Sequence, residues 1–342
     1  MLRLFFVIFL IFFFECSGND VQLFEKTRIV MDTLVSITIY AKQEPEDWQQ
    51  HVEQAFETMQ RIEDLATSFN DSSEVGQLNL NAGHRGISVH KDVLEIIKQA
   101  QEVGENSDGA FDVTVLPLLR LWNFKSSNPR VPTHDEVLEK RGLVDFRRIV
   151  INDNNVFLPE VNMGMDLGAI AKGYAVDKAV EVLEKYDYKN FMVEAGGDLR
   201  AIAGELTRGQ RTIWVRHPRK VAGFFAKIKM DEGAVASSGD YERFFEVSGK
   251  RFHHIVNPKT GYPASPVVSV TIFSETTVLA DAYATAVFVL GPEKGLDFIE
   301  KLPETEGLIV YQKEIDSDLI LDWKVSKGIA RDLEIFNQKG NL

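Results

Sequence analysis

The chain has 342 residues, of which 44% are hydrophobic and 26% are charged, which is ordinary globular composition. Its length allows one large domain or two smaller ones. A formal net charge of −13 at pH 7 argues against nucleic acid as a partner, since backbone binding needs a positive surface. A phosphate-bearing ligand would need local lysines, backbone N–H groups or a bridging metal ion.

Residues 1–16 have the pattern of an export signal. The apolar block 4–14 is shorter than the roughly 20 residues that a membrane-spanning helix needs. It is followed by Cys16, the only cysteine, so no disulfide forms within the chain. We expect Cys16 to be lipidated, as in bacterial lipoproteins, although Glu15 stands where such signals have a small residue. The chain would then face the periplasm or cell exterior from a membrane anchor; simple signal cleavage is the alternative.

The predicted elements of the mature chain mix strands with helices. Residues 17–28 read as a tether, and 30–40 alternate as a strand. Amphipathic helices are predicted over 45–66 and 90–104, because apolar residues recur there every three and four positions. No linker divides 29–342, so we expect one α+β domain with largely antiparallel sheets. Further predictions are a surface excursion over 126–148, a helix over 169–186, and strands over 149–151, 191–193, 212–215, 224–230, 241–247, 267–273, 308–311 and 319–323.

The apolar run 278–290 predicts a buried helix that carries two oxygen-bearing side chains, Asp281 and Thr285. Residues four apart lie on one helix face, one turn from each other. A buried carboxylate is costly unless a positive group meets it, and the run has no Lys or Arg. A hard cation held by carboxylate and hydroxyl oxygens would meet it. The structural alternative is that Asp281 caps the helix and Thr285 bonds back to a carbonyl.

The stretch 163–177 turns from a strand or loop into a helix near Gly168. Exposed N–H groups and the dipole at a helix start suit an anion, and Lys172 adds a positive charge. The segment is neither a P-loop nor a dinucleotide fingerprint, so its phosphate signal is weak alone. The structural alternative is that Asp166 caps the helix and Lys172 is solvated.

Gly196 and Gly197 follow a predicted strand and precede Asp198. Paired glycines at a strand end usually form a turn. In a functional role they would let a flat ring lie against bare backbone.

His253 and His254 are adjacent on a predicted strand that ends in a turn with proline and glycine. Neighbouring strand residues point to opposite faces, so one imidazole lies on each face. One of them is a candidate general base, since histidine is the usual choice near neutral pH. The alternative is a core histidine satisfied by a carbonyl.

Four of these segments together resemble the ordered signatures of the ApbE-type FAD:protein FMN transferases. They are Asp166–Asp177, the Gly196–Asp198 turn, His254–Gly261 and Ala280–Thr285. The resemblance extends over roughly 29–302, and four motifs in order are far more specific than one. Further matches are Met31–Thr33, Ser73–Glu74 with Leu78–Asn79, and Gly109–Asp112, which leads to Pro117 and Trp122.

The resemblance implies a T-fold-like mixed architecture and an exported, often lipid-anchored enzyme. Members bind FAD with a divalent cation, usually Mg²⁺, and move FMN onto a Thr or Ser hydroxyl of a partner protein, releasing AMP. The acceptors in this family are flavoprotein subunits of membrane redox complexes with a short Ser/Thr motif. Nothing in this sequence selects among them.

The family's functional residues carry over onto matching positions. Asp281 and Thr285 would supply side-chain oxygens to the cation, and a main-chain carbonyl near Ala169 would complete the protein's share. His254 would lie at the flavin nucleotide and take the proton from the acceptor hydroxyl. The residues that would contact or shape the flavin and adenosine pockets are Met31, Asp112, Asp166, Lys172, Gly196 and Gly197.

Two departures from the family pattern keep alternatives open. Phe69 stands in a loop where many transferases have Tyr, and Asp32 stands where the family often has Gly. Some members hydrolyse FAD to FMN and AMP with water as the acceptor, so a Mg²⁺-dependent FAD pyrophosphatase is one alternative. A passive periplasmic FAD-binding lipoprotein is another.

Overall fold

The computed structural model describes residues 21–124, 126–209, 211–315 and 318–336. The predicted signal, 1–16, with Cys16, lies outside the described residues. Among the described residues, no helix has the length and apolar character needed to cross a membrane.

The tether prediction is wrong for residues 22–28. They belong to strand β1 (Gln22–Val30), which pairs along its whole length with β2 (Thr33–Ala41). Strand β1 also rests on helix α1 (Trp48–Ala66), where Lys26 and Arg28 form ion pairs with Glu53. Polar residues in this stretch therefore meet partners on the sheet and helix rather than marking a linker.

The centre of the molecule is an eight-stranded sheet in the order β1-β2-β6-β7-β10-β13-β14-β15. Every neighbouring pair is antiparallel, which confirms the predicted α+β class with antiparallel sheets. The remaining strands of this sheet are β6 (Phe191–Ala195), β7 (Asp198–Ile202), β10 (Gly233–Gly239), β13 (Val267–Ser274), β14 (Glu306–Ile315) and β15 (Asp318–Val325).

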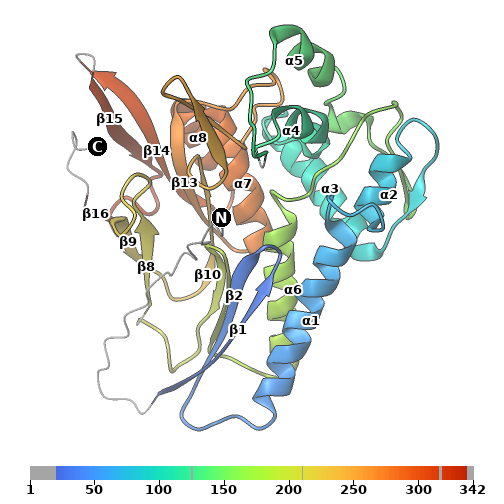
Figure 1. The fold of residues 1–342 in the computed structure, drawn as a ribbon. Helices are drawn as coiled ribbons and strands as arrows, with labels where there is room; N and C mark the ends of the chain where they lie inside the picture. The colour runs from blue at the N-terminus through green and yellow to red at the C-terminus, as the bar shows by residue number, and fades with distance from the viewer. Residues whose placement is uncertain (1–20, 125, 210, 316–317, 337–342) are drawn as a thin grey trace.

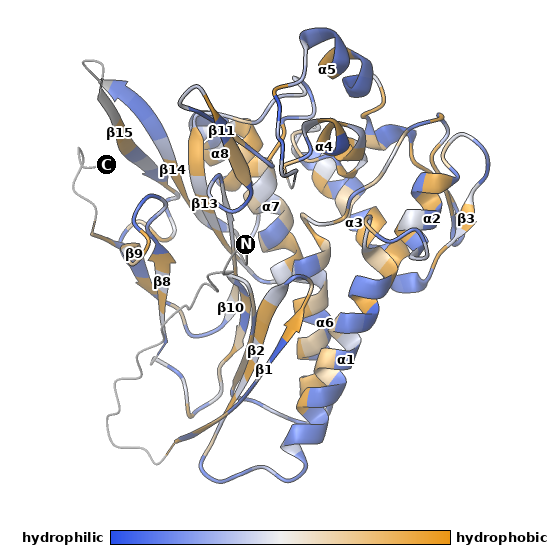
Figure 2. Ribbon diagram, viewed as in Figure 1, coloured by the Kyte–Doolittle hydropathy of each residue, from blue (hydrophilic) through white to orange (hydrophobic). Residues whose placement is uncertain are grey.

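Helices gather on one face of this sheet, with α1 and α6 lying side by side (Figure 1). Apolar side chains of α1, among them Val52, Phe56 and Met59, are fully buried in the main core, and hydrophilic and hydrophobic residues alternate along this helix (Figure 2). This amphipathic pattern is what a helix covering a sheet needs. The other helices here are α2 (Glu74–Leu80), α3 (Lys91–Asn106), α6 (Ala171–Lys185), α7 (Thr277–Leu290) and α8 (Pro292–Ile299).

Smaller layers complete the fold. The sheet β8 (Thr212–Arg216), β9 (Phe224–Lys229) and β16 (Glu334–Ile335) shares a second core with the main sheet, in which Met192 and Leu199 meet Ile213 and Phe225. A third core around Trp122 joins α4 (Leu116–Trp122), α5 (His134–Arg141) and the hairpin β11 (Phe244–Val247)–β12 (Lys250–His253). Short elements are β3 (Ile87–Ser88), β4 (Val150–Asn152), β5 (Asn155–Phe157) and the 3₁₀ turns η1 (Val113–Val115) and η2 (Phe146–Arg148).

Two further elements differ from the sequence-based expectations. Strand β10 was not predicted, because its residues Gly-Ala-Val-Ala-Ser-Ser-Gly are small and give no clear apolar alternation. The surface excursion 126–148 contains helix α5, which begins with a capping box in which Thr133 and Glu136 bond each other's backbone N–H groups.

Candidate functional site

A cavity of about 520 Å³ lies where the β1–β2 turn, the start of α6, the β11–β12 hairpin and α7 converge. It brings together nearly all of the predicted site residues, which come from distant parts of the sequence. They are Met31, Asp112, Asp166, Ala169, Lys172, Gly196, His254, Asp281 and Thr285. Gly197 is the exception: it lines a neighbouring cavity of about 50 Å³, which Gly196 also lines, and its contact with a ligand stays a prediction.

Asp281 lies inside α7 rather than at its start, which overturns the capping alternative. The helix begins at Thr277, and the carboxylate of Asp177 accepts hydrogen bonds from the N–H groups of Thr277 and Val278, both at 2.9 Å. Asp177 is thus the residue that satisfies the first turn of α7.

The crossing of α6 and α7 fixes one oxygen of Asp281. Its Oδ2 accepts a hydrogen bond from the N–H of Gly173 at 3.1 Å. The two helices approach so closely there that a Cβ on Gly173 would lie 2.3 Å from the carbonyl oxygen of Thr277. Glycine at this position therefore lets backbone reach the carboxylate.

The charge around Asp281 is balanced by Lys172. Burial raises the pKa of Asp281, while the nearby Lys172 and the Gly173 hydrogen bond act to lower it. Lys172 forms an ion pair with Asp198, which is 1% exposed, so it is not a freely solvated side chain. Burial alone would lower the pKa of Lys172, but the charges of Asp198, Asp281 and Glu242 raise it above its usual value, so its ammonium stays charged.

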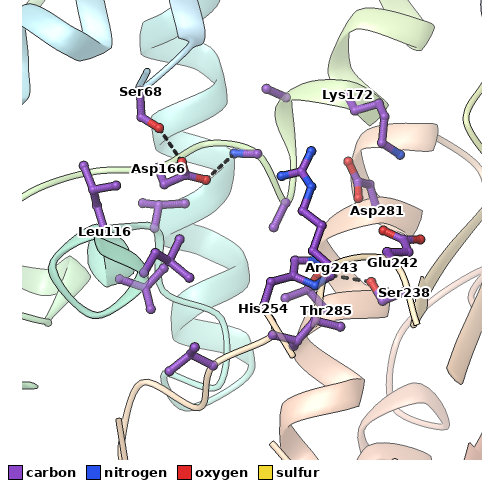
Figure 3. Close-up of a pocket in the computed structure, with 18 of the residues that line it drawn as sticks. Ser68, Leu116, Asp166, Lys172, Ser238, Glu242, Arg243, His254, Asp281 and Thr285 are labelled. Atoms are coloured by element: carbon purple, nitrogen blue, oxygen red, sulfur yellow. Dashed lines mark hydrogen bonds between the residues drawn. The ribbon is translucent and has the colours of Figure 1, made fainter. Parts of the chain in front are cut away.

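The oxygens near Asp281 suit a hard cation. Thr285, one turn further along α7, lies beside Ser238, with 3.2 Å between their hydroxyl oxygens (Figure 3). Ala169 lines the same cavity. Carboxylate, hydroxyl and carbonyl oxygens are what Mg²⁺ prefers. Within the described ranges, no three His, Cys, Asp or Glu side chains are grouped to hold a metal.

Asp166 is held in place from both sides. It accepts hydrogen bonds from the Ser68 hydroxyl and from the N–H of Gly168, the latter at 2.9 Å (Figure 3). The side chain of Asn79 bonds the N–H and the carbonyl of Met165, at 2.6 and 2.9 Å. Helix α6 begins only at Ala171, without a side-chain cap, so Asp166 orders the loop before the helix rather than capping it.

Asp112 lines the cavity, but the protein already uses both of its carboxylate oxygens. One accepts from the N–H and the hydroxyl of Thr114, at 2.8 and 2.6 Å, and the other from the N–H of Phe146 at 3.0 Å. Burial raises the pKa of Asp112, and these bonds counteract the rise. Its main role in the described structure is to hold η1 and η2 together at the cavity wall.

The two adjacent histidines face different surroundings, as predicted. His253 is buried, and its Nε2 lies 2.8 Å from the carbonyl oxygen of Ala264, the arrangement expected of a core histidine. His254 lines the cavity, and its Nδ1 has no partner among the described residues. Burial and the nearby positive charge of Arg243 lower the pKa of His254 to about 3. His254 is therefore neutral near pH 7 and able to accept a proton.

Two tight turns meet at the edge of the cavity. Met31 and Asp32 both have positive φ, 57° and 58°, in the two-residue turn between β1 and β2. The N–H of Met31 donates to Glu63 at 2.7 Å. Gly196 has a φ of 57°, and a Cβ there would lie 2.3 Å from the hydroxyl of Thr33. Asp32 thus adopts the conformation for which glycine is favoured, and the turn keeps its geometry.

The comparisons with known proteins agree with this geometry. Residues 31–309 match the profile of the ApbE family. The chain belongs to the ApbE family. A FAD:protein FMN transferase of Treponema pallidum is 32% identical over 315 residues, which cover 87% of each chain. The crystal structure of the ApbE protein from Thermotoga maritima is 33% identical, with a TM-score of 0.81 over 91% of this chain and 99% of that one. The flavin transferase ApbE from Vibrio cholerae is 26% identical, with a TM-score of 0.78 over the same shares.

The ApbE family resemblance deduced from the sequence motifs is thereby confirmed. Sequence reasoning nevertheless missed several residues that line the cavity. Ser237 and Ser238 lie near the end of the unpredicted strand β10, and Glu242 and Arg243 follow in the turn that leads into β11. No motif marks them. The only available signal was their position between a strand of small residues and the hairpin that carries His254.

Proposed function

We propose that this member of the ApbE family is a FAD:protein FMN transferase that requires a divalent cation, usually Mg²⁺. The transferase class follows from the family and from its curated relatives in several bacteria. The observation that carries the proposal is the open side of Asp281 at the cavity. This buried carboxylate has one hydrogen bond from the part of the chain that the structure describes, and Thr285 lines the same cavity one helical turn further along.

The cation would be held by Asp281, Thr285 and the carbonyl of Ala169, together with oxygens of the FAD diphosphate. When bound, it withdraws negative charge from the diphosphate. An acidic protein gains by this arrangement, because the cation offsets the repulsion between its carboxylates and the substrate phosphates. Lys172, charged and held by Asp198, lies on the same side and would contact the nucleotide.

The acceptor hydroxyl would react at the phosphorus of the FMN half of FAD. Its oxygen forms the new phosphoester bond, and the bond from that phosphorus to the bridging oxygen breaks. The bridging oxygen leaves with its electron pair on AMP. The hydroxyl proton goes to His254, which is neutral near pH 7. Its Nδ1 has no hydrogen-bond partner among the described residues. The protein's main contribution is to position these groups and to stabilise charge.

Hydrolysis of FAD to FMN and AMP is a second candidate, favoured by one observation. The side chain of Phe69 is 70% exposed and lines the cavity, where a tyrosine would offer a hydroxyl. Water would then replace the protein hydroxyl as acceptor. A passive FAD-binding protein is the third candidate, and it predicts retention of FAD without release of AMP.

One assay separates these three functions. The full chain is incubated with FAD and Mg²⁺, with and without a candidate flavoprotein subunit that carries a Ser/Thr motif. A transferase releases AMP and adds the mass of FMN to the acceptor. AMP release that is equally fast without acceptor identifies a hydrolase, and absence of AMP in both samples would refute catalysis. EDTA should abolish the release, and His254→Gln should slow it about 100-fold or more without loss of FAD binding.

We further propose that Cys16 anchors the chain to the membrane, where acceptor subunits of membrane redox complexes are reached from the periplasm or cell exterior. The proposal rests on the apolar block before Cys16 and on the absence of a second cysteine. Labelling with a fatty-acid analogue tests it. Label on the wild type that is lost in Cys16→Ser is the expected result, and label that survives this substitution contradicts it.

A further inference from the structure

Arg243 is a cation of the cavity whose side chain has no hydrogen bond or ion pair among the described residues, although its charge acts on the neighbouring Glu242 and His254. It stands between β10 and β11 and is exposed into the cavity. Within the described ranges, its guanidinium forms no hydrogen bond and no ion pair. Figure 3 shows the side chain reaching into the cavity, with Asp166 on one side and Asp281 and Lys172 on the other. An arginine with five unused donors in such a place is suited to an anionic ligand.

The backbone fixes Arg243 next to His254. The N–H of His254 donates to the carbonyl oxygen of Arg243 at 3.0 Å, at the open end of the β11–β12 hairpin. The positive charge of Arg243 also contributes to the low pKa of His254, so the two side chains sense each other. A group bound by Arg243 would therefore lie close to the atom that receives the proton.

Lys172 cannot neutralise a diphosphate by itself. Its ammonium is paired with Asp198 and also faces the carboxylates of Asp281 and Glu242. Beside the proposed divalent cation, a further positive group would favour a diphosphate that lies among these carboxylates. Arg243 reaches into the cavity between Asp166 and the pair Asp281 and Lys172, and its planar guanidinium can donate two parallel hydrogen bonds to one phosphate.

We propose that Arg243 binds the diphosphate of FAD and stabilises the charge that develops on the AMP leaving group. The inference rests on the proposed transferase or hydrolase function, because both break the same phosphorus–oxygen bond. As that bond breaks, the bridging oxygen gains a negative charge, and a guanidinium hydrogen-bonded to the adenylate phosphate offsets it. Arg243 then acts as a catalytic residue that contacts the substrate, beside His254 as the base.

Equilibrium binding of ADP tests the contact without any turnover. The affinity of the full chain for ADP is measured by displacement of FAD, followed by flavin fluorescence in EDTA. We expect Arg243→Ala to weaken ADP binding roughly 10- to 100-fold, the usual effect of losing charge-assisted hydrogen bonds. Arg243→Lys should recover part of the affinity, because charge returns without the planar fork. Adenosine, which lacks phosphate, should bind the wild type and Arg243→Ala alike.

Lys250→Ala is the matched control. It removes the same charge from the same hairpin at a position that does not line the cavity. We expect wild-type ADP affinity for Lys250→Ala. A loss of affinity equal to that of Arg243→Ala would mean that Arg243 acts through its charge in general and not through a direct contact with the diphosphate. Thermal unfolding of both variants should stay close to the wild type, since Arg243→Ala removes no hydrogen bond or ion pair among the described residues.

Turnover separates this inference from the proposed function. With saturating FAD and Mg²⁺, Arg243→Ala should lower kcat for AMP release at least 10-fold, beyond its effect on KM. Wild-type AMP release combined with unchanged kcat and ADP affinity in Arg243→Ala would overturn the role of Arg243 and leave the proposed function standing. A wild type that neither releases AMP nor binds ADP would overturn both.

Discussion

Asp112 and Asp281 line the same cavity, and burial raises the pKa of both carboxyls, yet the protein treats them differently. Three donors from the protein bind the oxygens of Asp112, from Thr114 and Phe146. Among the described residues, Asp281 receives one hydrogen bond, from Gly173. The carboxylate of Asp112 is engaged mainly in hydrogen bonds within the protein, whereas the carboxylate of Asp281 can still accept contacts from a bound cation or substrate.

The difference shows how a motif match can conceal two roles. Both residues lie in stretches that resemble the family signatures, and both were expected to serve the ligand. Their hydrogen bonds separate them, because the protein supplies donors to both oxygens of Asp112 and so leaves that carboxylate less capacity for a cation or a phosphate. An oxygen at a cavity with donors missing remains available for binding.

The largest expected effect belongs to Asp281→Asn. The amide keeps the shape of the side chain but removes the charge that would hold the cation, so AMP release from FAD should fall about 100-fold or more. Stability should change little or increase, since an ionised group no longer has to be buried. Chromatographic detection of AMP and thermal unfolding check the two parts. Near-normal AMP release at saturating Mg²⁺ would show that Asp281 does not hold the cation.

Asp112→Ala should show the opposite pattern, with a large loss of stability and a small effect on the Mg²⁺ dependence of AMP release. Removal of the carboxylate leaves the N–H groups of Thr114 and Phe146 without acceptors, so the free energy of unfolding should fall by about 2–4 kcal/mol. Urea unfolding measures this loss. The dependence of AMP release on Mg²⁺ concentration should stay at the wild-type value for the protein that remains folded. A variant as stable as the wild type, with weakened Mg²⁺ dependence, would place Asp112 with Asp281 as a functional ligand.

Some of this contrast could be predicted from the sequence, and some could not. The four-residue spacing of Asp281 and Thr285 within an apolar run places both on one helix face, and the structure shows that helix. The hydrogen bond from Gly173 to Asp281 spans 108 positions, and the cap that Asp177 gives to α7 spans about 100. Contacts of this kind depend on how α6 and α7 cross, which periodicity does not encode.

The site residues that sequence reasoning missed share a physical cause. Strand β10 consists of small residues and lies against α7, and this composition gives no recognisable strand pattern. Neither Ser238 within the strand nor Glu242 and Arg243 just after it could therefore be placed at the cavity from the sequence. His254 was found because an adjacent pair of histidines before a Pro and Gly turn is unusual. Single charged residues in a turn are common in any sequence, so they cannot be recognised as site residues by their pattern.

The smallest expected effect is on the pH dependence of the free energy of unfolding. It tests whether burial at the cavity, which raises the pKa of the two carboxyls, also lowers the pKa of His254. Its pKa is lowered to about 3 in the folded chain, against 6.5 in the unfolded chain. Between these values the unfolded state binds a proton that the folded state does not. The free energy of unfolding should therefore decrease as the pH falls from 6.5 towards 3, and His254 should have no such effect above 6.5.

His254→Gln should flatten this part of the pH profile in urea unfolding, while His84→Gln, at an exposed position, should leave it unchanged. The expected change is modest, because solvent reaches the cavity and screens part of the charge. An unchanged slope in His254→Gln would mean that the imidazole can be protonated in the folded state at little cost. His254 would then be cationic at mildly acid pH, and AMP release would decline with a midpoint near 6.5 instead of persisting to lower pH, as a neutral base requires.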